Sequence, residues 1–227
     1  AILTARIDRL SSLVKETVKA AAVIGREFDI PILSEVMKTQ EGFSHTNSNA
    51  PTLLREQVKR AEQGQIWHAM NELRYIFRHA LLREAVYGMQ LRTRLEQLHG
   101  LIAEAIERLY HDQIEERYAD LAFHYEQANI YDKTCEYLQK AADYARSNYQ
   151  NQQALDYYEK LLSKLGNRRE TADQIQAYLS KGRVLELIGD WEACQKAYEE
   201  ALDQAKKSRD VLLLGQANNH LGRLLIK

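Results

Sequence analysis

The chain has 227 residues, of which 45% are apolar and 28% are charged, and its formal net charge is −1 at pH 7. This balance is ordinary for a soluble globular protein and lacks the basic excess of a dedicated nucleic-acid binder. Only two prolines and ten glycines interrupt a chain that is rich in helix-forming residues. The composition therefore predicts a mainly α-helical fold.

The two cysteines, Cys135 and Cys194, lie within helical patterns and form no C-x-x-C motif. This usage indicates a reducing, cytoplasmic compartment. No apolar run approaches the roughly 18 residues of a membrane span, and no signal peptide is visible. The chain does not begin with Met and ends at Lys227 inside a helical pattern, so we expect it to be a piece of a larger protein.

The first part of the chain predicts three helices. Residues 12–24 carry an apolar stripe at helical spacing, and Gly25 follows as a stop signal. The stretch "FDIPILSEVMK" begins a second helix, with Asp29 as its N-cap. Residues 39–52 are polar and turn-rich, which favours a loop, and residues 53–63 form a third helix.

The pattern then changes in "QIWHAMNELRYIF". Leu73, Tyr75 and Phe77 alternate with other residues as in a half-buried strand, and residues 66–67 supply a short partner. Three helices followed by a small β-hairpin are the layout of a winged helix. We therefore expect a winged-helix-like domain with trailing helices over residues 1–110.

The trailing helices are predicted at 80–90 and 91–110, because both segments place apolar residues on one face. The face of the first comprises Leu81, Leu82, Ala85, Val86 and Met89.

Residues 113–227 are repetitive, and "IQAYLSKGRVLELIGDWEACQKAYEEALDQA" fits the helical-pair template of about 34 residues. Gly182 takes the small position of the first helix and Tyr198 the aromatic position of the second. A related pair is predicted at 115–142 and a further helix at 150–165. We interpret this part as an antiparallel helical solenoid of degenerate, tetratricopeptide-like repeats.

The last segment, "GQANNHLGRLLIK", predicts another first helix, with Gly222 in the small position and no partner helix. Gly182 and Gly222 are 40 residues apart, which departs from the template. Because repeats bury their apolar faces only by stacking, we expect further repeats to follow in the intact protein.

Motifs for catalysis are absent from the sequence. It contains no Gly-rich phosphate loop, no H-E-x-x-H and no serine nucleophile elbow. The seven histidines lack the spacing of metal ligands. We expect no catalytic residue, no metal site and no cofactor in this chain.

Nucleic-acid binding has two weak signals. Arg55, Lys59 and Arg60 on the third helix could contact DNA, but Glu56 and Glu62 interleave with them, as on a solvated helix face. The 13 tyrosines fall mostly at repeat positions, where they pack one helix on the next rather than stack on bases.

Four blocks carry a family resemblance: "ARIDRL", "KAAAVIGREFDIPILSEV", "YIFRHALLREAVY" and "LAFHYEQA". With the repeats after them, they resemble the C-terminal part of bacterial STAND proteins (signal transduction ATPases with numerous domains). The nearest resemblance is to those AAA ATPase regulators fused to adenylate/guanylate cyclases, protein kinases or transcription activators. It covers nearly the whole chain, and "VIGREF" and "FRHALLREAVY" are its most specific parts.

The resemblance implies an upstream ATPase module that holds ADP or ATP with Mg. By motif match His79, with Arg78 beside it, would contact the nucleotide phosphate in the full-length protein. A helix N-terminus is a suitable place for such a contact. The alternatives are that His79 only caps its helix or packs behind the hairpin, and that Arg78 forms a surface salt bridge.

The implied function is that of a non-catalytic regulatory fragment. The winged helix would restrain the nucleotide-binding module, and the repeats would bind a protein or small-molecule signal. Two alternatives stay open: a repeat scaffold for protein–protein interaction, and a winged-helix regulator that binds DNA. Neither nucleic acid nor a membrane is an expected partner of the favoured function.

Overall fold

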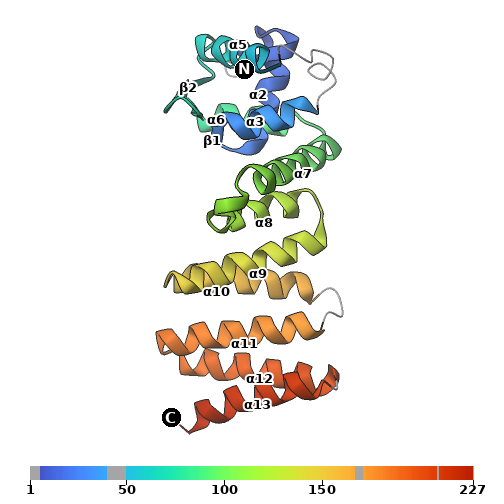
Figure 1. Ribbon diagram of the computed structural model, residues 1–227, viewed down its shortest axis with the longest axis vertical. Helices are drawn as coiled ribbons and strands as arrows, with labels where there is room; N and C mark the ends of the chain where they lie inside the picture. Colours follow the sequence, from blue (N-terminus) through green and yellow to red (C-terminus); the bar gives the residue numbers. More distant parts are fainter. Residues whose placement is uncertain (1–5, 40–49, 167–170, 209, 227) are drawn as a thin grey trace. The chain divides into compact units, whose positions relative to one another are not determined.

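The computed structural model describes residues 6–39, 50–166, 171–208 and 210–226. The described chain is mainly α-helical, as the composition predicted, and it contains one small sheet. Contacts divide it into two compact units, Ala1–Ile130 and Tyr131–Lys227, and Figure 1 labels most of their helices and strands.

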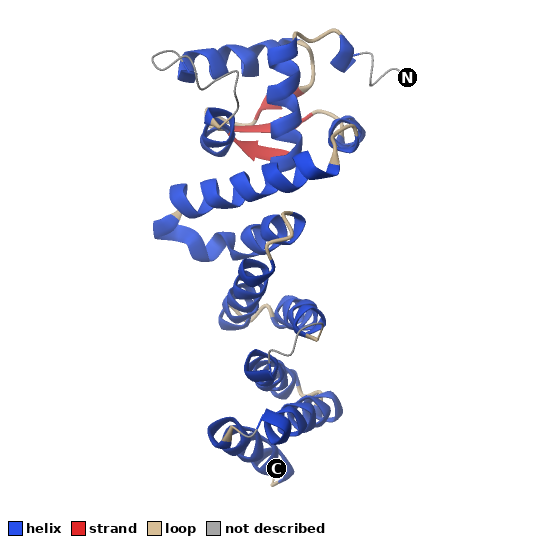
Figure 2. Cartoon of the chain, turned by 90° about the vertical axis from the view of Figure 1, so that its right-hand side faces the viewer, coloured by secondary structure: helices blue, strands red, loops and turns tan. Residues whose placement is uncertain are grey.

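The first unit combines helices with a three-stranded antiparallel sheet in the order β1-β3-β2. The sheet lies among the helices of the unit (Figure 2). Its elements are α2 (Ser12–Ile24), β1 (Glu27–Asp29), α3 (Ile30–Lys38), α5 (Ala50–Gln63), β2 (Trp67–Ala69), β3 (Arg74–Phe77), α6 (Ala80–Gly88), α7 (Arg92–Leu109), the 3₁₀ helix η1 (His111–Arg117) and α8 (Tyr118–Gln127).

Aromatic side chains form the centre of this unit. Phe28, Trp67 and Phe77, one from each strand, are buried, with ring centroids 4.9–5.7 Å apart. Edge and tilted contacts of this kind add to the free energy gained by burial alone. The indole N–H of Trp67 donates to the carbonyl of Val58 on α5 at 3.1 Å, so its one polar atom is satisfied.

Strand β1 was not predicted from the sequence. Residues Glu27–Asp29 pair with β3, and α3 begins only at Ile30. Asp29 stands at the N-cap position, but its side chain makes no capping hydrogen bond. The predicted N-cap position is therefore confirmed, but the carboxylate accepts hydrogen bonds from Arg74 and Arg117 instead of capping the helix.

Two other predictions in this unit need correction. Helix α5 begins at Ala50, inside the segment that was expected to be a loop, and residues 40–49 lie outside the described residues. On α6 only part of the predicted apolar face is buried. Leu82 and Val86 pack inside, whereas Leu81 and Met89 are exposed, because α6 ends at Gly88 and one edge of its stripe faces solvent.

The second unit is a stack of antiparallel helices (Figure 1). Its elements are α9 (Tyr131–Ser147), α10 (Asn151–Leu165), α11 (Thr171–Ile188), α12 (Trp191–Ser208) and α13 (Val211–Leu225). The first residues of α9, α11 and α13 are 40 positions apart, as are those of α10 and α12. The spacing that looked irregular beside a shorter template is therefore the regular period of this stack.

The 40-residue period shows which helices form pairs. Gly182 on α11 faces the ring of Tyr198 on α12 so closely that a Cβ atom there would lie 2.2 Å from it. One period earlier Ala142 and Tyr158 hold the same positions on α9 and α10, and both are buried. The pair predicted at 115–142 was therefore wrong, since α9 pairs with α10.

The division between units also differs from the expected one at residues 110–113. Helix α8 belongs to the first unit, where it packs on α7. Its His124 forms a buried hydrogen bond with His99 of α7. The boundary therefore follows α8 rather than preceding it.

Candidate functional site

The two residues singled out from the sequence, Arg78 and His79, lie between β3 and α6, and both are exposed. The backbone N–H of Arg78 donates to the carbonyl of Ile66 at 3.0 Å, which holds the junction to the sheet. Within the described part of the chain, neither side chain has an ion pair or a hydrogen bond. The structure thus presents both side chains to solvent and assigns neither a partner.

His79 caps α6 through its backbone only. Its carbonyl oxygen accepts hydrogen bonds from the N–H groups of Leu82 at 3.1 Å and Arg83 at 3.3 Å. Its imidazole makes no capping hydrogen bond. The side chain is therefore not needed to begin the helix, and its contact with a nucleotide phosphate stays a prediction.

The rest of the block "FRHALLREAVY" anchors α6. The guanidinium of Arg83 donates to the carbonyl of Ala22 on α2 at 2.7 Å and lies over the ring of Tyr87. The hydroxyl of Tyr87 is 2.9 Å from Nε2 of His99 on α7. These contacts give a structural reason for Arg83 and Tyr87 in the block.

Tyr87 contacts one member of a buried histidine pair, which the sequence did not reveal. Nδ1 of His99 and Nδ1 of His124 are 2.8 Å apart, so a single proton lies between the rings. Burial lowers the pKa of His99 to about 4 and that of His124 to about 3, and the nearby charge of Arg83 acts in the same direction. Both imidazoles are thus neutral and join α7 to α8.

A second polar cluster surrounds Asp29. Its carboxylate accepts from Nε of Arg74 at 2.8 Å, from Nη2 of Arg117 at 3.2 Å and from the hydroxyl of Tyr110 at 3.3 Å. It ties β1 to β3 and to the segment after α7. Because the carboxylate already has three partners, the cluster is a structural joint rather than an open binding site.

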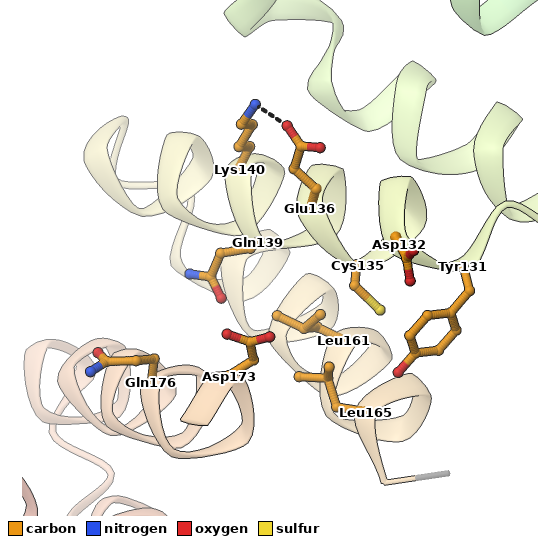
Figure 3. A pocket seen from close by; sticks show the side chains of 10 residues that line it. All are labelled: Tyr131, Asp132, Cys135, Glu136, Gln139, Lys140, Leu161, Leu165, Asp173 and Gln176. Carbon is orange, nitrogen blue, oxygen red and sulfur yellow. Dashed lines mark hydrogen bonds and ion pairs between the residues drawn. The ribbon is translucent and has the colours of Figure 1, made fainter. Parts of the chain in front are cut away.

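The second unit contains a pocket of about 590 Å³, a size typical of small-molecule sites (Figure 3). It opens among α9, α10 and the start of α11. The side chains around it are Tyr131, Asp132, Cys135, Glu136, Gln139, Lys140, Leu161, Leu165, Asp173 and Gln176.

The pocket combines an apolar floor with polar walls. Leu161 and Leu165 of α10 supply the floor, while Asp173 extends toward it from α11 (Figure 3). On the opposite wall Glu136 accepts from the ammonium group of Lys140 at 2.6 Å. The pocket could not be predicted from the sequence because its residues come from three helices. The 40-residue period, once recognised, shows that some of these residues differ in type from their equivalents in the next repeat.

In the described ranges, no group of three or more His, Cys, Asp or Glu side chains is placed to hold a metal ion. No helix there is both long and apolar enough to cross a membrane. On α5, Arg60 pairs with Glu56 at 2.5 Å, which agrees with a solvated, mixed-charge face.

Comparisons with known proteins give no family assignment. No model of a known protein family matches the chain, and no curated protein matches it. Among solved structures, BtubC (BKLC) from P. vanneervenii matches at 16% identity and a TM-score of 0.46, over 94% of this chain and 84% of that chain.

A second structure is a Signal Transduction ATPase with Numerous Domains (STAND) protein with a tetratricopeptide repeat sensor, from Pyrococcus horikoshii. It matches at 12% identity and a TM-score of 0.33, over 97% of this chain. The chain spans 48% of the length of that protein. At these scores neither similarity carries an argument about what this chain does.

Proposed function

We propose that the chain is the regulatory and signal-binding part of a larger STAND-type ATPase and that it catalyses no reaction itself. The observation that carries the proposal is the pocket among α9, α10 and α11, which is large enough for a ligand and lies within a stack of helical pairs. Stacked helical repeats offer extended binding surfaces. In this proposal the repeats bind the activating signal.

The first unit would contact the ATPase module of the same chain. Its elements α2, β1, α3, α5, β2 and β3 follow one another in an order that supports a winged helix. Exposure of Arg78 and His79 leaves both side chains available to an anion, while Arg83 and Tyr87 hold α6 in place. ADP or ATP with Mg would be held by the upstream module, with His79 reaching the phosphate.

The second candidate is a scaffold for protein–protein interaction. It is favoured by large apolar side chains that α13 and its end expose, namely Val211, Leu212, Leu225 and Ile226. A scaffold would bind its partner equally well whether the full-length protein holds ADP, ATP or no nucleotide. A regulatory fragment would bind its signal with an affinity that depends on the nucleotide.

The reading frame of the complete gene tests the proposal directly. A STAND-type protein must encode, upstream of this segment, a Gly-rich phosphate loop and a later acidic strand for Mg. We expect both. If the complete reading frame contains neither, the proposal is wrong and the scaffold becomes the better interpretation.

A further inference from the structure

The pocket lies in one repeat of the stack. The 40-residue period allows a direct comparison with the equivalent place in the next repeat. Between α11 and α13 the amide of Gln176 donates to the side-chain oxygen of Gln216 at 3.0 Å. One period earlier the equivalent residues are Glu136 and Gln176, and both line the pocket. Glu136 binds Lys140 of its own helix instead, so no such hydrogen bond closes the space between α9 and α11.

Two side chains that fill the equivalent place in the next repeat are replaced at the pocket. Ile175 on α11 is fully buried and Leu213 on α13 is 7% exposed, and both belong to the hydrophobic core of the repeats. Their equivalents one period earlier are Cys135 and Asp173. A smaller side chain and a carboxylate thus stand where the next repeat places packed aliphatic groups, which leaves the space open.

Three carboxylates line this space, those of Asp132, Glu136 and Asp173. Two ammonium groups bind Glu136, that of Lys140 at 2.6 Å and that of Lys133 at 3.6 Å. Within the described residues Asp173 forms no ion pair, although it projects toward the apolar floor (Figure 3). Asp173 therefore places a carboxylate beside Leu161 and Leu165.

We propose that this pocket binds a small organic cation, a protonated amine or guanidinium on an apolar stem. The cation pairs with Asp173, and the stem lies on Leu161 and Leu165. A carboxylate beside an apolar floor stabilises a ligand that carries both features, and it disfavours an anion of the same shape. The inference rests on the proposed function only in taking the repeats as the signal-binding part.

Cys135 provides the readout, because it lines the pocket and the only other cysteine is inaccessible. Cys194 is fully buried, and its S–H donates to the carbonyl of Gly182. The experiment measures the rate at which a maleimide modifies Cys135 in the intact chain, with 4-phenylbutylamine, 4-phenylbutan-1-ol or 4-phenylbutyrate present. We expect the amine to slow modification and the alcohol and carboxylate to have little effect at the same concentration.

Substitutions then test the role of the charge. By calorimetry, Asp173→Asn should weaken 4-phenylbutylamine binding about tenfold, the range expected for loss of a charged hydrogen-bond partner. The matched control, Asp203→Asn, removes an exposed carboxylate from α12 that does not line the pocket, and it should leave the affinity unchanged. Circular dichroism melting checks that both variants remain folded.

A variant that fills the pocket tests whether the open space is needed for binding. Asp173→Leu introduces the residue type of the next repeat, so it should close the space, abolish amine binding and protect Cys135 without any ligand. Equal protection by the alcohol, or an unchanged affinity in Asp173→Asn, would overturn the proposal. It would also be overturned if a lysine-containing peptide bound while the free amine did not, since the occupant would then be a protein partner.

The test is separate from that of the proposed function. Lack of an upstream phosphate loop would end the STAND assignment and leave the amine measurements intact. Conversely, failure of the amine to bind would remove this ligand class, while an upstream phosphate loop would still support the regulatory role.

Discussion

Gly182 and Gly222 occupy the same position in successive repeats, yet their surroundings differ completely. A Cβ atom at Gly182 would meet the buried ring of Tyr198 at 2.2 Å, whereas a Cβ atom at Gly222 would have nothing within 4 Å. Because the ring of Tyr198 is fixed inside the core, it cannot move aside cheaply. Position 182 therefore requires glycine for its packing against α12, whereas Gly222 faces no other helix among the described residues.

We predict opposite effects of alanine at these two positions. Gly182→Ala should lower the free energy of unfolding by about 1–3 kcal/mol, the usual cost of an overpacked core. Gly222→Ala should leave it unchanged or raise it by up to about 1 kcal/mol, because alanine favours helix. Urea denaturation of both variants measures the difference, and equal effects would refute the assigned packing.

The buried histidines make stability depend on pH. Their folded-state pKa values, about 4 for His99 and about 3 for His124, lie below the ordinary value of 6.5. Below about pH 6 the unfolded chain therefore binds protons that the folded chain does not, so acid favours unfolding. Between about pH 6 and pH 4 these two groups should reduce stability by about 2–3 kcal/mol per pH unit.

Urea denaturation across that pH range tests the prediction. The double variant His99→Gln/His124→Asn should show a flatter dependence of the free energy of unfolding on pH, although it is less stable at pH 7. His111→Asn, which changes an exposed histidine, should retain the original slope. A double variant with the parental slope would show that other groups cause the acid sensitivity.

Among the elements, β1 is joined to its neighbours by its pairing with β3, by the buried ring of Phe28 and by the carboxylate of Asp29. Its carboxylate is 12% exposed and binds Arg74 on β3 and Arg117 at the end of η1. Removal of one member of such a cluster leaves the others short of partners. The joint therefore matters more to stability than an ordinary surface ion pair.

Asp29→Ala should lower the free energy of unfolding by about 1–3 kcal/mol. Asp120 also contacts Arg117, at 3.2 Å, but it is 51% exposed. Asp120→Ala should therefore cost no more than about 1 kcal/mol. Thermal melts of both variants decide the matter. Equal losses would mean that Asp29 acts only as another surface charge.

Helix positions were predictable wherever an apolar stripe was long, as at residues 12–24 and 150–165. Strand β1 was not predictable, because its three residues are too few for alternation to show, and Pro31, two residues after it, suggests a helix start. The pairing of α9 was also missed. Its period differs from the familiar template, and only packing shows that Tyr158 holds the position that Tyr198 holds on α12.

At the scale of the whole molecule, the sequence predicted a mainly helical chain with a sheet-containing part and a repeat part. It did not predict the ligand-sized pocket, because Cys135 and Asp173 look ordinary until they are compared with Ile175 and Leu213 one period later. Nor did it separate the anchoring residues of "FRHALLREAVY" from the exposed ones. Arg78 and His79 are among the exposed side chains, and the proposed nucleotide contact would depend on them.

Retention of ADP by the full-length protein tests the regulatory role most directly. His79→Ala should speed the release of bound ADP and raise basal activity, because the imidazole would no longer reach the phosphate. His68→Ala provides the control, since it removes another exposed histidine of the same unit, on β2. If His79→Ala releases ADP at the parental rate while the protein remains folded, this side chain does not sense the nucleotide, and the proposed restraint of the ATPase through it is wrong.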